Sequence, residues 1–345
     1  MRKMALDIVT GGAGFIGSHL VDRLLEDPDR RVRVIDNFSN GTLRNLEHLQ
    51  GEPRLEVVEA DLADFRGIEG AFDGAERVFH LAALADIVPS IEKPEAYYRS
   101  NVDGTFNALN QSVKCGIERF IYAASSTCYG IPDSYPTKET AEIRPQYPYA
   151  LTKHLGEQLV LHWAKVYKLP ALSLRMFNVY GPRSRTSGTY GAVFGVFLAQ
   201  LLANEPLTIV GDGEQTRDFT FVADVVDAFL AAASSDRAGE IYNVGSRGTY
   251  SINRLVSLLG AQKTVYIPKR PGEPDCTWAD VSKIERDIGW QAHVGFDEGV
   301  RRMLDNIESW RDAPVWTPER IAGATAGWFK YLGNEISSTP REPVE

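Results

Sequence analysis

The chain has 345 residues, of which 43% are hydrophobic and 24% are charged, and its formal net charge is −9. This length exceeds what most single cores hold, so we expect one large domain and a smaller one. The acidic balance argues against a general binder of nucleic acid or of membrane surfaces, because either would need a basic face. It does not exclude a small anionic ligand held by a few local arginines.

The cysteines and the apolar runs of the sequence indicate in which cellular compartment the protein is expected. Cys115, Cys128 and Cys276 lie far apart and form no CxxC pair, which favours neither a disulfide framework nor a metal site. The first residues run directly into a strand-like segment, and no apolar run reaches the length of a membrane span. We therefore expect a cytoplasmic protein without a signal peptide, a membrane segment or a bound metal.

A strand, a glycine turn and a helix open the chain. Residues 6–10 are typical of a short buried strand, and 18–26 have helical periodicity. Between them stands the spacing Gly11-x-x-Gly14-x-x-Gly17. Such a turn lets a pyrophosphate approach the backbone and begins a helix whose first N–H groups face the anion. The context of strand and helix makes a ligand-free glycine turn the weaker interpretation.

The second strand, 32–36, ends in Asp36, about 20 residues after the last glycine. An acid at this distance accepts the hydroxyls of an adenine ribose and repels a 2′-phosphate. Alone, Asp36 would be an ordinary residue of a turn. Together with the glycine turn it predicts a dinucleotide site that takes NAD rather than NADP.

Further strands are expected at 55–59, 77–81 and 119–124, with a helix of about 20 residues from Pro94 to Lys114. Strands that alternate with helices predict an α/β fold with a Rossmann-type, doubly wound parallel sheet. We assign the NAD-binding domain to 1–177, with later segments returning to it. Residues 178–333 mainly form a smaller mixed α/β substrate lobe, and 334–345 form a tail.

Tyr149 and Lys153 are four residues apart, which places them on one face of a helix, one turn from each other. An ammonium beside a phenol favours the phenolate and lowers the pKa of the tyrosine. Such a tyrosine can take a proton from an alcohol near neutral pH. Most pairs at this spacing are plain helix surface, so the weight of this one comes from the glycine turn. The strand at 119–124 delivers Ser125 to the same edge of the sheet.

These residues resemble the extended short-chain dehydrogenase/reductase superfamily, in its NAD-dependent nucleotide-sugar epimerase/dehydratase branch. Within this branch the chain is UDP-glucose 4-epimerase-like. The resemblance runs from about residue 5 to about residue 310. It is specific for the branch and less specific for the reaction. The matching segments are 10–17, 36–37, 61–62, 80–83, 101–102, 125–130, 149–153, 175–182, 217–219, 270–272 and 279–283.

The resemblance implies how NAD is held. Gly11, Gly14 and Gly17 would face the pyrophosphate, Asp36 would bind the adenosine ribose, and Lys153 would hold the nicotinamide ribose. Asp61 and Leu62 would lie at the adenine. The further NAD-binding residues that it implies are Phe15, Ile16, Asn37, Leu81, Ala82, Ala83, Asn101, Tyr149 and Phe177.

The resemblance also implies the catalytic and substrate residues. Tyr149 would be the base and acid, Lys153 would lower its pKa, and Ser125 would hydrogen-bond the reacting hydroxyl. Two arginines on a pyrophosphate would explain a basic site in an acidic protein. The implied substrate-binding residues are Ser125, Ser126, Asn178, Thr208, Arg217, Arg270 and Thr277.

The positions after Ser125 separate the reactions of the branch. Relatives that dehydrate or decarboxylate the sugar tend to carry a carboxylate there, whereas this chain has Ser126 and Thr127. Elimination of water needs a group that protonates the leaving hydroxyl. The sequence therefore favours an NAD-dependent UDP-hexose 4-epimerase, which oxidises C4 transiently and returns the hydride to the opposite face.

Several alternatives stay open. The small Thr277 stands where the family has a size gate, so a UDP-N-acetylhexosamine is a second candidate substrate. A 4,6-dehydratase or 4-oxidoreductase with its acid elsewhere is the main alternative reaction. A non-catalytic dinucleotide-binding regulator is disfavoured because Tyr149, Lys153 and Ser125 are all present. Relatives often dimerise through the helices around 102–114 and 149–168, so we expect a homodimer. The resemblance gives no account of 313–332.

Overall fold

The computed structural model describes residues 4–184 and 191–333. The expected tail at 334–345 lies outside the described residues. Within the two described ranges, no helix combines the length and the apolar character needed to cross a bilayer.

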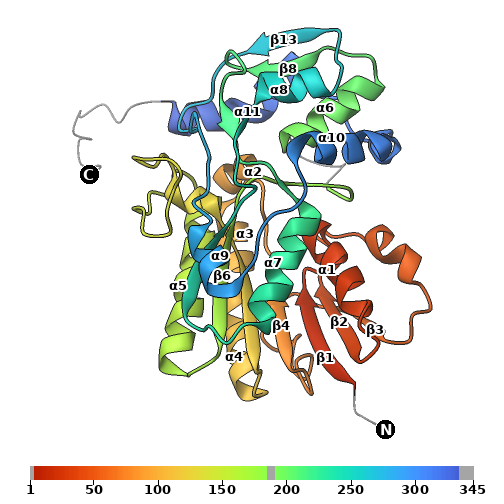
Figure 1. Cartoon of the computed structure of the whole chain (residues 1–345), viewed down its shortest axis with the longest axis vertical. Coiled ribbons are helices and arrows are strands. Elements are labelled where there is room, and N and C mark those ends of the chain that lie inside the picture. The colour runs from red at the N-terminus through yellow and green to blue at the C-terminus, as the bar shows by residue number, and fades with distance from the viewer. Residues whose placement is uncertain (1–3, 185–190, 334–345) are drawn as a thin grey trace, which may run out of the picture.

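Seven parallel strands form the central sheet in the order β11-β6-β5-β4-β1-β2-β3, which fills the lower half of the view in Figure 1. The chain adds strands to one side of β1 and then crosses to the other side with β4, and doubly wound sheets bind ligands at such a switch. The fold is therefore the predicted α/β Rossmann type. The strands are β1 (Ala5–Thr10), β2 (Arg30–Asp36), β3 (Leu55–Glu59), β4 (Arg77–His80), β5 (Arg119–Ser125), β6 (Ala171–Met176) and β11 (Glu240–Val244).

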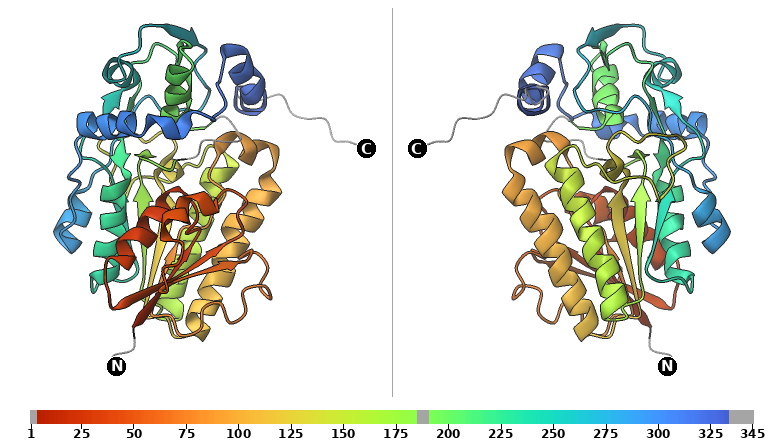
Figure 2. Two further views of the ribbon diagram at one scale, coloured as in Figure 1. Left: turned by 90° about the vertical axis from the view of Figure 1, so that its right-hand side faces the viewer. Right: turned by 90° about the vertical axis from the view of Figure 1, so that its left-hand side faces the viewer.

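Helices cover both faces of the sheet (Figure 2). On one face α1 (Phe15–Leu25) packs against α7 (Val222–Ser234), and on the other α4 (Gly104–Lys114) packs against α5 (Pro148–Val166). Because side chains alternate along a strand, Ile8 of β1 enters one core and Val9 enters the other. Both are fully buried, which explains why apolar residues follow one another along β1 instead of alternating with polar ones.

The helix expected from Pro94 to Lys114 is interrupted. It consists of α3 (Pro94–Tyr98), a π-helical turn η2 (Arg99–Asp103) and α4. The wider turn contains Asn101, whose carboxamide accepts a hydrogen bond from Leu84 N at 2.8 Å and donates one to Leu84 O at 3.0 Å. A π turn inside a helix often occurs beside a functional site, and this one fixes the loop that follows β4.

A second lobe with its own apolar core lies above the sheet in Figure 1. It contains three pairs of short strands: β7 (Val179–Tyr180) with β10 (Thr220–Phe221), β8 (Leu207–Val210) with β13 (Thr264–Ile267), and β9 (Thr216–Arg217) with β12 (Tyr250–Ser251). Its helices are α6 (Val193–Leu202), α8 (Ile252–Leu258), α10 (Phe296–Asp305), η4 (Ile307–Trp310) and α11 (Pro318–Leu332). The remaining elements are η1 (Leu43–Leu49), α2 (Ile87–Glu92), η3 (Ser126–Tyr129) and α9 (Ser282–Ile288), which packs on β11.

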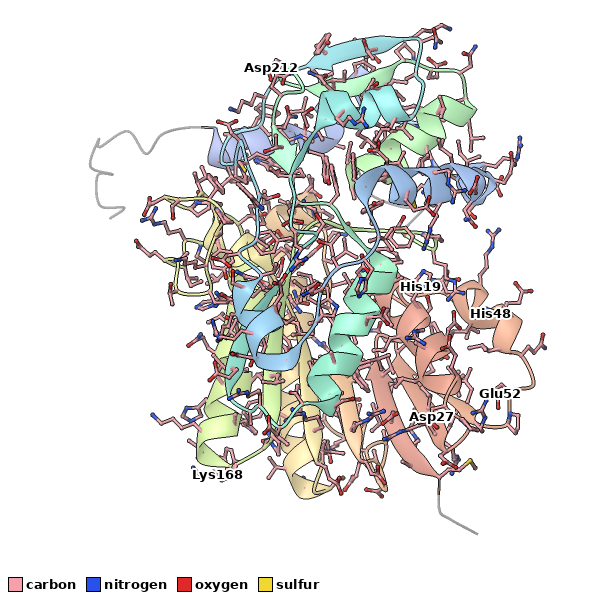
Figure 3. All side chains as sticks on the ribbon, viewed as in Figure 1. His19, Asp27, His48, Glu52, Lys168 and Asp212 are labelled. Carbon is pink, nitrogen blue, oxygen red and sulfur yellow. The ribbon has the colours of Figure 1, made fainter. Side chains whose placement is uncertain are left out.

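The loop after β7 forms a hydrogen bond and an ion pair with α1, near the two histidines labelled in Figure 3. His19 Nε2 donates to Pro182 O at 2.9 Å, and burial lowers the pKa of His19. Arg183 pairs with Asp22 at 2.7 Å, and Asp22 also contacts His48 Nε2 at 2.7 Å. These contacts hold the edge of the second lobe against the helix that follows the glycine turn.

Candidate active site

A cleft of about 1020 Å³ opens at the carboxyl edge of the sheet and extends into the second lobe. Its walls come from the ends of β1, β2, β4 and β5, from the first turns of α5, and from β8, β9 and the 270–277 loop. The topology therefore brings residues from most of the chain to one cavity. All but two of the site residues predicted from the sequence line it.

The glycine turn leaves backbone where side chains would otherwise stand. Gly11 has φ +69°, a conformation that favours glycine, and a Cβ there would lie 2.8 Å from the backbone of Ala82. A Cβ on Gly17 would lie 2.2 Å from Gly11 O. The N-cap of α1, Gly14, has no side-chain cap, and the first turn carries no acid. The first N–H groups of α1 thus suit an anion.

Asp36 ends β2, lines the cleft and is 7% exposed. Its carboxylate accepts hydrogen bonds from Ala13 N at 3.0 Å and from Phe38 N at 2.9 Å. Burial raises the pKa of Asp36, and these two hydrogen bonds act in the opposite direction. Each carboxylate oxygen keeps further acceptor capacity for a ribose hydroxyl. The glycine turn and this carboxylate together fit a dinucleotide.

Ser125, Tyr149 and Lys153 all line the middle of the cleft. Ser125 ends β5, Tyr149 lies in the first turn of α5, which Pro148 opens, and Lys153 follows one turn later. A hydrogen bond joins the Ser125 hydroxyl and the Tyr149 phenol. The ring of Tyr147 lies parallel to that of Tyr149, with centroids 6.5 Å apart. The arrangement presents a phenol and a hydroxyl to one ligand.

The expected effect of Lys153 on Tyr149 is wrong for the chain by itself. Burial raises the pKa of Tyr149, the hydrogen bond from Ser125 lowers it, and the charge of Asp86 raises it further. Lys153 is 5% exposed, and burial lowers its own pKa to about 7. Its Nζ lies 4.4 Å from the centroid of the Tyr122 ring. Helical spacing predicted the shared face, but in the chain by itself desolvation is the largest influence on both residues: it raises the pKa of Tyr149 and lowers the pKa of Lys153.

A buried ion pair lies behind Lys153. Burial opposes the charge of Glu157, but hydrogen bonds from Arg175 and Ser173, together with His154 Nδ1 at 3.6 Å, bring its pKa to about 2. Arg175 Nη2 donates to Glu157 Oε1 at 2.6 Å. The Glu157 charge in turn raises the pKa of Lys153 against the effect of burial. Arg175 therefore acts on the site from inside the core.

The second lobe supplies the polar groups of the other half of the cleft. Arg217 is 7% exposed and donates to Glu273 Oε1 at 2.8 Å, and Arg270 Nη1 lies 3.8 Å from Glu273 Oε2. Thr277 Oγ1 donates to Asn178 Oδ1 at 2.6 Å. Two guanidiniums around one carboxylate form a site that can take a second anion.

Asn101 and Phe177 are the two predicted residues that do not line the described cleft. Asn101 is 1% exposed and also donates to Thr152 Oγ1 at 3.0 Å. Phe177 is 2% exposed in the core between the sheet and α7. Both residues support the walls of the cleft from behind.

Among the cleft residues that sequence reasoning missed are Asp86, Tyr147, Trp316 and Trp328. Asp86 precedes α2, and no local pattern marks it. The tryptophans carried a weak signal, because three of the six in the chain lie between residues 310 and 328. Such a density of large aromatic residues in a segment without an assigned role indicates a buried or binding surface.

A model of the NAD dependent epimerase/dehydratase family matches residues 8–245. The chain belongs to this family. A putative UDP-glucose 4-epimerase from Methanocaldococcus jannaschii is 35% identical over 305 residues, which are 86% of this chain and 97% of the relative. The structure of UDP-glucose 4-epimerase from Thermotoga maritima with UDP-glucose has a TM-score of 0.82 and 34% identity, covering 89% of this chain and 99% of that one.

A solved structure of similar fold contains the cofactor that the family name indicates. UDP-glucuronic acid 4-epimerase from Bacillus cereus, in complex with UDP-glucuronic acid and NAD, has a TM-score of 0.81 and 32% identity, covering 88% of this chain and 99% of that one. NAD is therefore the cofactor, and the glycine turn and Asp36 fit it. Relatives of similar identity include UDP-glucuronic acid decarboxylases and a dTDP-glucose 4,6-dehydratase, so family membership shows a nucleotide-sugar enzyme without fixing its reaction.

Proposed function

We propose that the chain is an NAD-dependent UDP-hexose 4-epimerase. The observation that supports this most is the pairing of the Tyr149 phenol with Ser125, followed by Ser126 and Thr127 in place of a carboxylate. Among the described residues that line the cleft, the acids are Asp36, Asp61, Asp86 and Glu273, and none of them follows Ser125.

Each residue of the site is assigned one role in the proposed reaction. Ser125 orients the 4-hydroxyl of the sugar, and Tyr149 takes its proton as the phenolate. NAD, when bound, supplies the acceptor and then the donor of a hydride at C4. Arg217 and Arg270 hold the diphosphate, so the keto sugar can rotate on this anchor and present its other face. Tyr149 then returns the proton.

Asp86 bears on the charge of the sugar. It lines the cleft, and its negative charge opposes ionisation of Tyr149. A carboxylate that lines the cleft and acts on the reacting phenol repels a sugar that carries a carboxylate of its own. We therefore propose a neutral hexose rather than a uronic acid as the substrate. Asp86→Asn is expected to raise kcat/KM for UDP-glucuronate relative to UDP-glucose about 10-fold.

The same carboxylate favours one alternative, a 4,6-dehydratase in which Asp86 serves as the acid. The two reactions differ in their products: a 4-epimer, or a 4-keto-6-deoxy sugar. Incubation with UDP-, dTDP-, GDP- and CDP-glucose, with the products identified by NMR, separates them. UDP-galactose from UDP-glucose supports the proposal, whereas a 4-keto-6-deoxy product from any of these sugars replaces it.

The size of the sugar pocket is open to a direct test at Thr277. Its hydroxyl accepts from Asp218 N at 3.1 Å and orients Asn178, and its side chain is small. We propose that an acetamido group fits beside it. Thr277→Tyr is expected to lower kcat/KM for UDP-N-acetylglucosamine about 10-fold more than for UDP-glucose, whereas Thr277→Val removes only the hydroxyl. Equal loss for both sugars with Thr277→Tyr would contradict this.

We also propose that two copies pair through α4 and α5. Large apolar side chains are exposed along this face, among them Phe106 at 42%, Leu151 at 46%, Val166 at 50% and Tyr167 at 53%. Burial of such a stripe against a second copy would remove it from water. Light scattering is expected to give twice the chain mass, and Phe106→Glu is expected to give the monomer.

A further inference from the structure

Residues 313–332 close one side of the cleft. Ala313, Pro314, Trp316 and Trp328 all line it. Gln200 Nε2 donates to Trp316 O at 2.6 Å, which ties the start of the segment to α6. The helix that follows, α11, packs against α2, next to the loop after β4 (Figure 2). The segment therefore runs from the second lobe to the NAD-binding part of the molecule.

Trp328 of α11 reaches Arg270, one of the two arginines proposed to bind the diphosphate. Its side chain is nearly buried, at 3% exposure, and its Nε1 donates to Pro271 O at 2.8 Å. The guanidinium carbon of Arg270 lies over the indole, 5.6 Å from the ring centroid. An indole therefore fixes both the backbone of the 270–272 turn and the charged group that the turn carries.

The contact suits a guanidinium that must bind an anion. A guanidinium that stacks by its face on an aromatic ring donates hydrogen bonds from its edges. Arg270 and Arg217 flank Glu273, and Glu273 Oε2 is a buried oxygen without a hydrogen-bond partner in the described structure. The two arginines are thus arranged around an anionic centre, and the position of Arg270 there depends on the ring beneath it.

Trp328 also contacts the catalytic end of the cleft. Its ring lies 6.1 Å from that of Tyr147, whose ring is parallel to that of Tyr149. One side chain from a segment near the end of the chain therefore touches both the expected diphosphate site and the aromatic wall beside the reacting phenol.

We propose that Trp328 is a positioning residue that holds Arg270 in place for the diphosphate of the nucleotide sugar, which makes 313–332 part of the substrate site. This inference rests on the proposed function, because it assigns Arg270 to that diphosphate. NAD binds at the other end of the cleft and should not depend on Trp328.

A double-mutant cycle tests the proposal, with UDP as the ligand and affinity measured by calorimetry. Trp328→Ala is expected to weaken UDP binding about 10-fold in the natural chain and less than 2-fold in an Arg270→Met background. NAD affinity should stay unchanged, and KM for UDP-glucose should rise more than kcat falls. Trp328→Phe keeps an aromatic ring but lacks the N–H group, so its UDP affinity should fall about 3-fold. If the alanine variant does not fold, Trp328→Phe replaces it in the double-mutant cycle.

Phe329→Ala is the matched control, because Phe329 is the next residue of α11 and is 37% exposed. It should leave UDP affinity unchanged. Equal losses from the Trp328 change in both backgrounds, or no loss in either, would overturn the positioning role. The measurement needs no turnover, so a chain that binds UDP as predicted but yields no 4-epimer would retain this inference and lose the proposed function.

Discussion

The proposed NAD side and the proposed sugar side of the cleft are built in different ways. On the NAD side, the backbone turn at Gly11 and the carboxylate of Asp36 stand directly at the ends of neighbouring strands. On the sugar side, Arg217, Arg270 and Trp328 come from three segments that share no regular element. The first site follows from the sheet itself, whereas the second depends on packing between distant segments. Changes on one side should therefore leave the other intact.

The largest effect is expected where the two sides meet. Tyr149→Phe removes the proposed base and acid and keeps the ring, so kcat should fall by about 10²- to 10⁴-fold. NAD and UDP affinities should change little. Tyr98→Phe is the control, because Tyr98 is 50% exposed and lies away from the cleft. Steady-state kinetics with UDP-glucose provide the measurement, and undiminished turnover would eliminate Tyr149 as the base.

On the NAD side, Gly17→Ala introduces a Cβ 2.2 Å from Gly11 O and should widen the glycine turn. We expect NAD affinity to fall about 100-fold, since the helix N-terminus moves away from the pyrophosphate. UDP affinity should change less than 3-fold. Gly323→Ala, where a Cβ meets nothing within 4 Å, is the control. Calorimetric titration with NAD and with UDP gives the two affinities. Equal losses of both would contradict the independence of the two sides of the cleft.

On the sugar side, Arg217→Gln should produce the reverse pattern. Loss of a charge-assisted contact to a diphosphate is expected to weaken UDP binding about 10- to 100-fold. NAD affinity should be unaffected, because Arg217 lies on β9 of the second lobe. Arg254→Gln, on the exposed side of α8, should change neither affinity. An NAD defect in Arg217→Gln would show that the two sides are coupled.

These contrasts also explain what the sequence could predict. Gly11, Gly17 and Asp36 lie within one strand–helix–strand unit, so their spacing along the chain carries their arrangement in space. Tyr149 and Lys153 were placed correctly by helical spacing, but the direction of the Tyr149 pKa was not, because spacing says nothing about desolvation. Asp86 and Trp328 reach the cleft through tertiary packing, which leaves no local pattern at Asp86 and only the density of tryptophans between residues 310 and 328 as a weak signal for Trp328.

The last expected effect concerns stability and pH. The pKa of Lys153 is about 7 in the fold against 10.5 as the reference value. Between these values the unfolded chain binds more protons than the native one, so the free energy of unfolding rises with pH in this window. Lys153→Met should lack this rise, which amounts to about 2 kcal/mol between pH 7 and pH 9.

The comparison is made on protein stripped of NAD, by urea unfolding at both pH values. Lys165→Met, an exposed change on the same helix, should keep the slope of the natural chain. A Lys153→Met slope equal to that of the natural chain would mean that burial does not shift the lysine.

The fate of a deuterium label at C4 of UDP-glucose tests the central proposal most directly. If the hydride leaves C4 and returns to the opposite face, the product is UDP-galactose that keeps the deuterium at C4. Deuterium at C6 of a 4-keto-6-deoxy sugar, or UDP-galactose that has exchanged its label with water, would contradict the account.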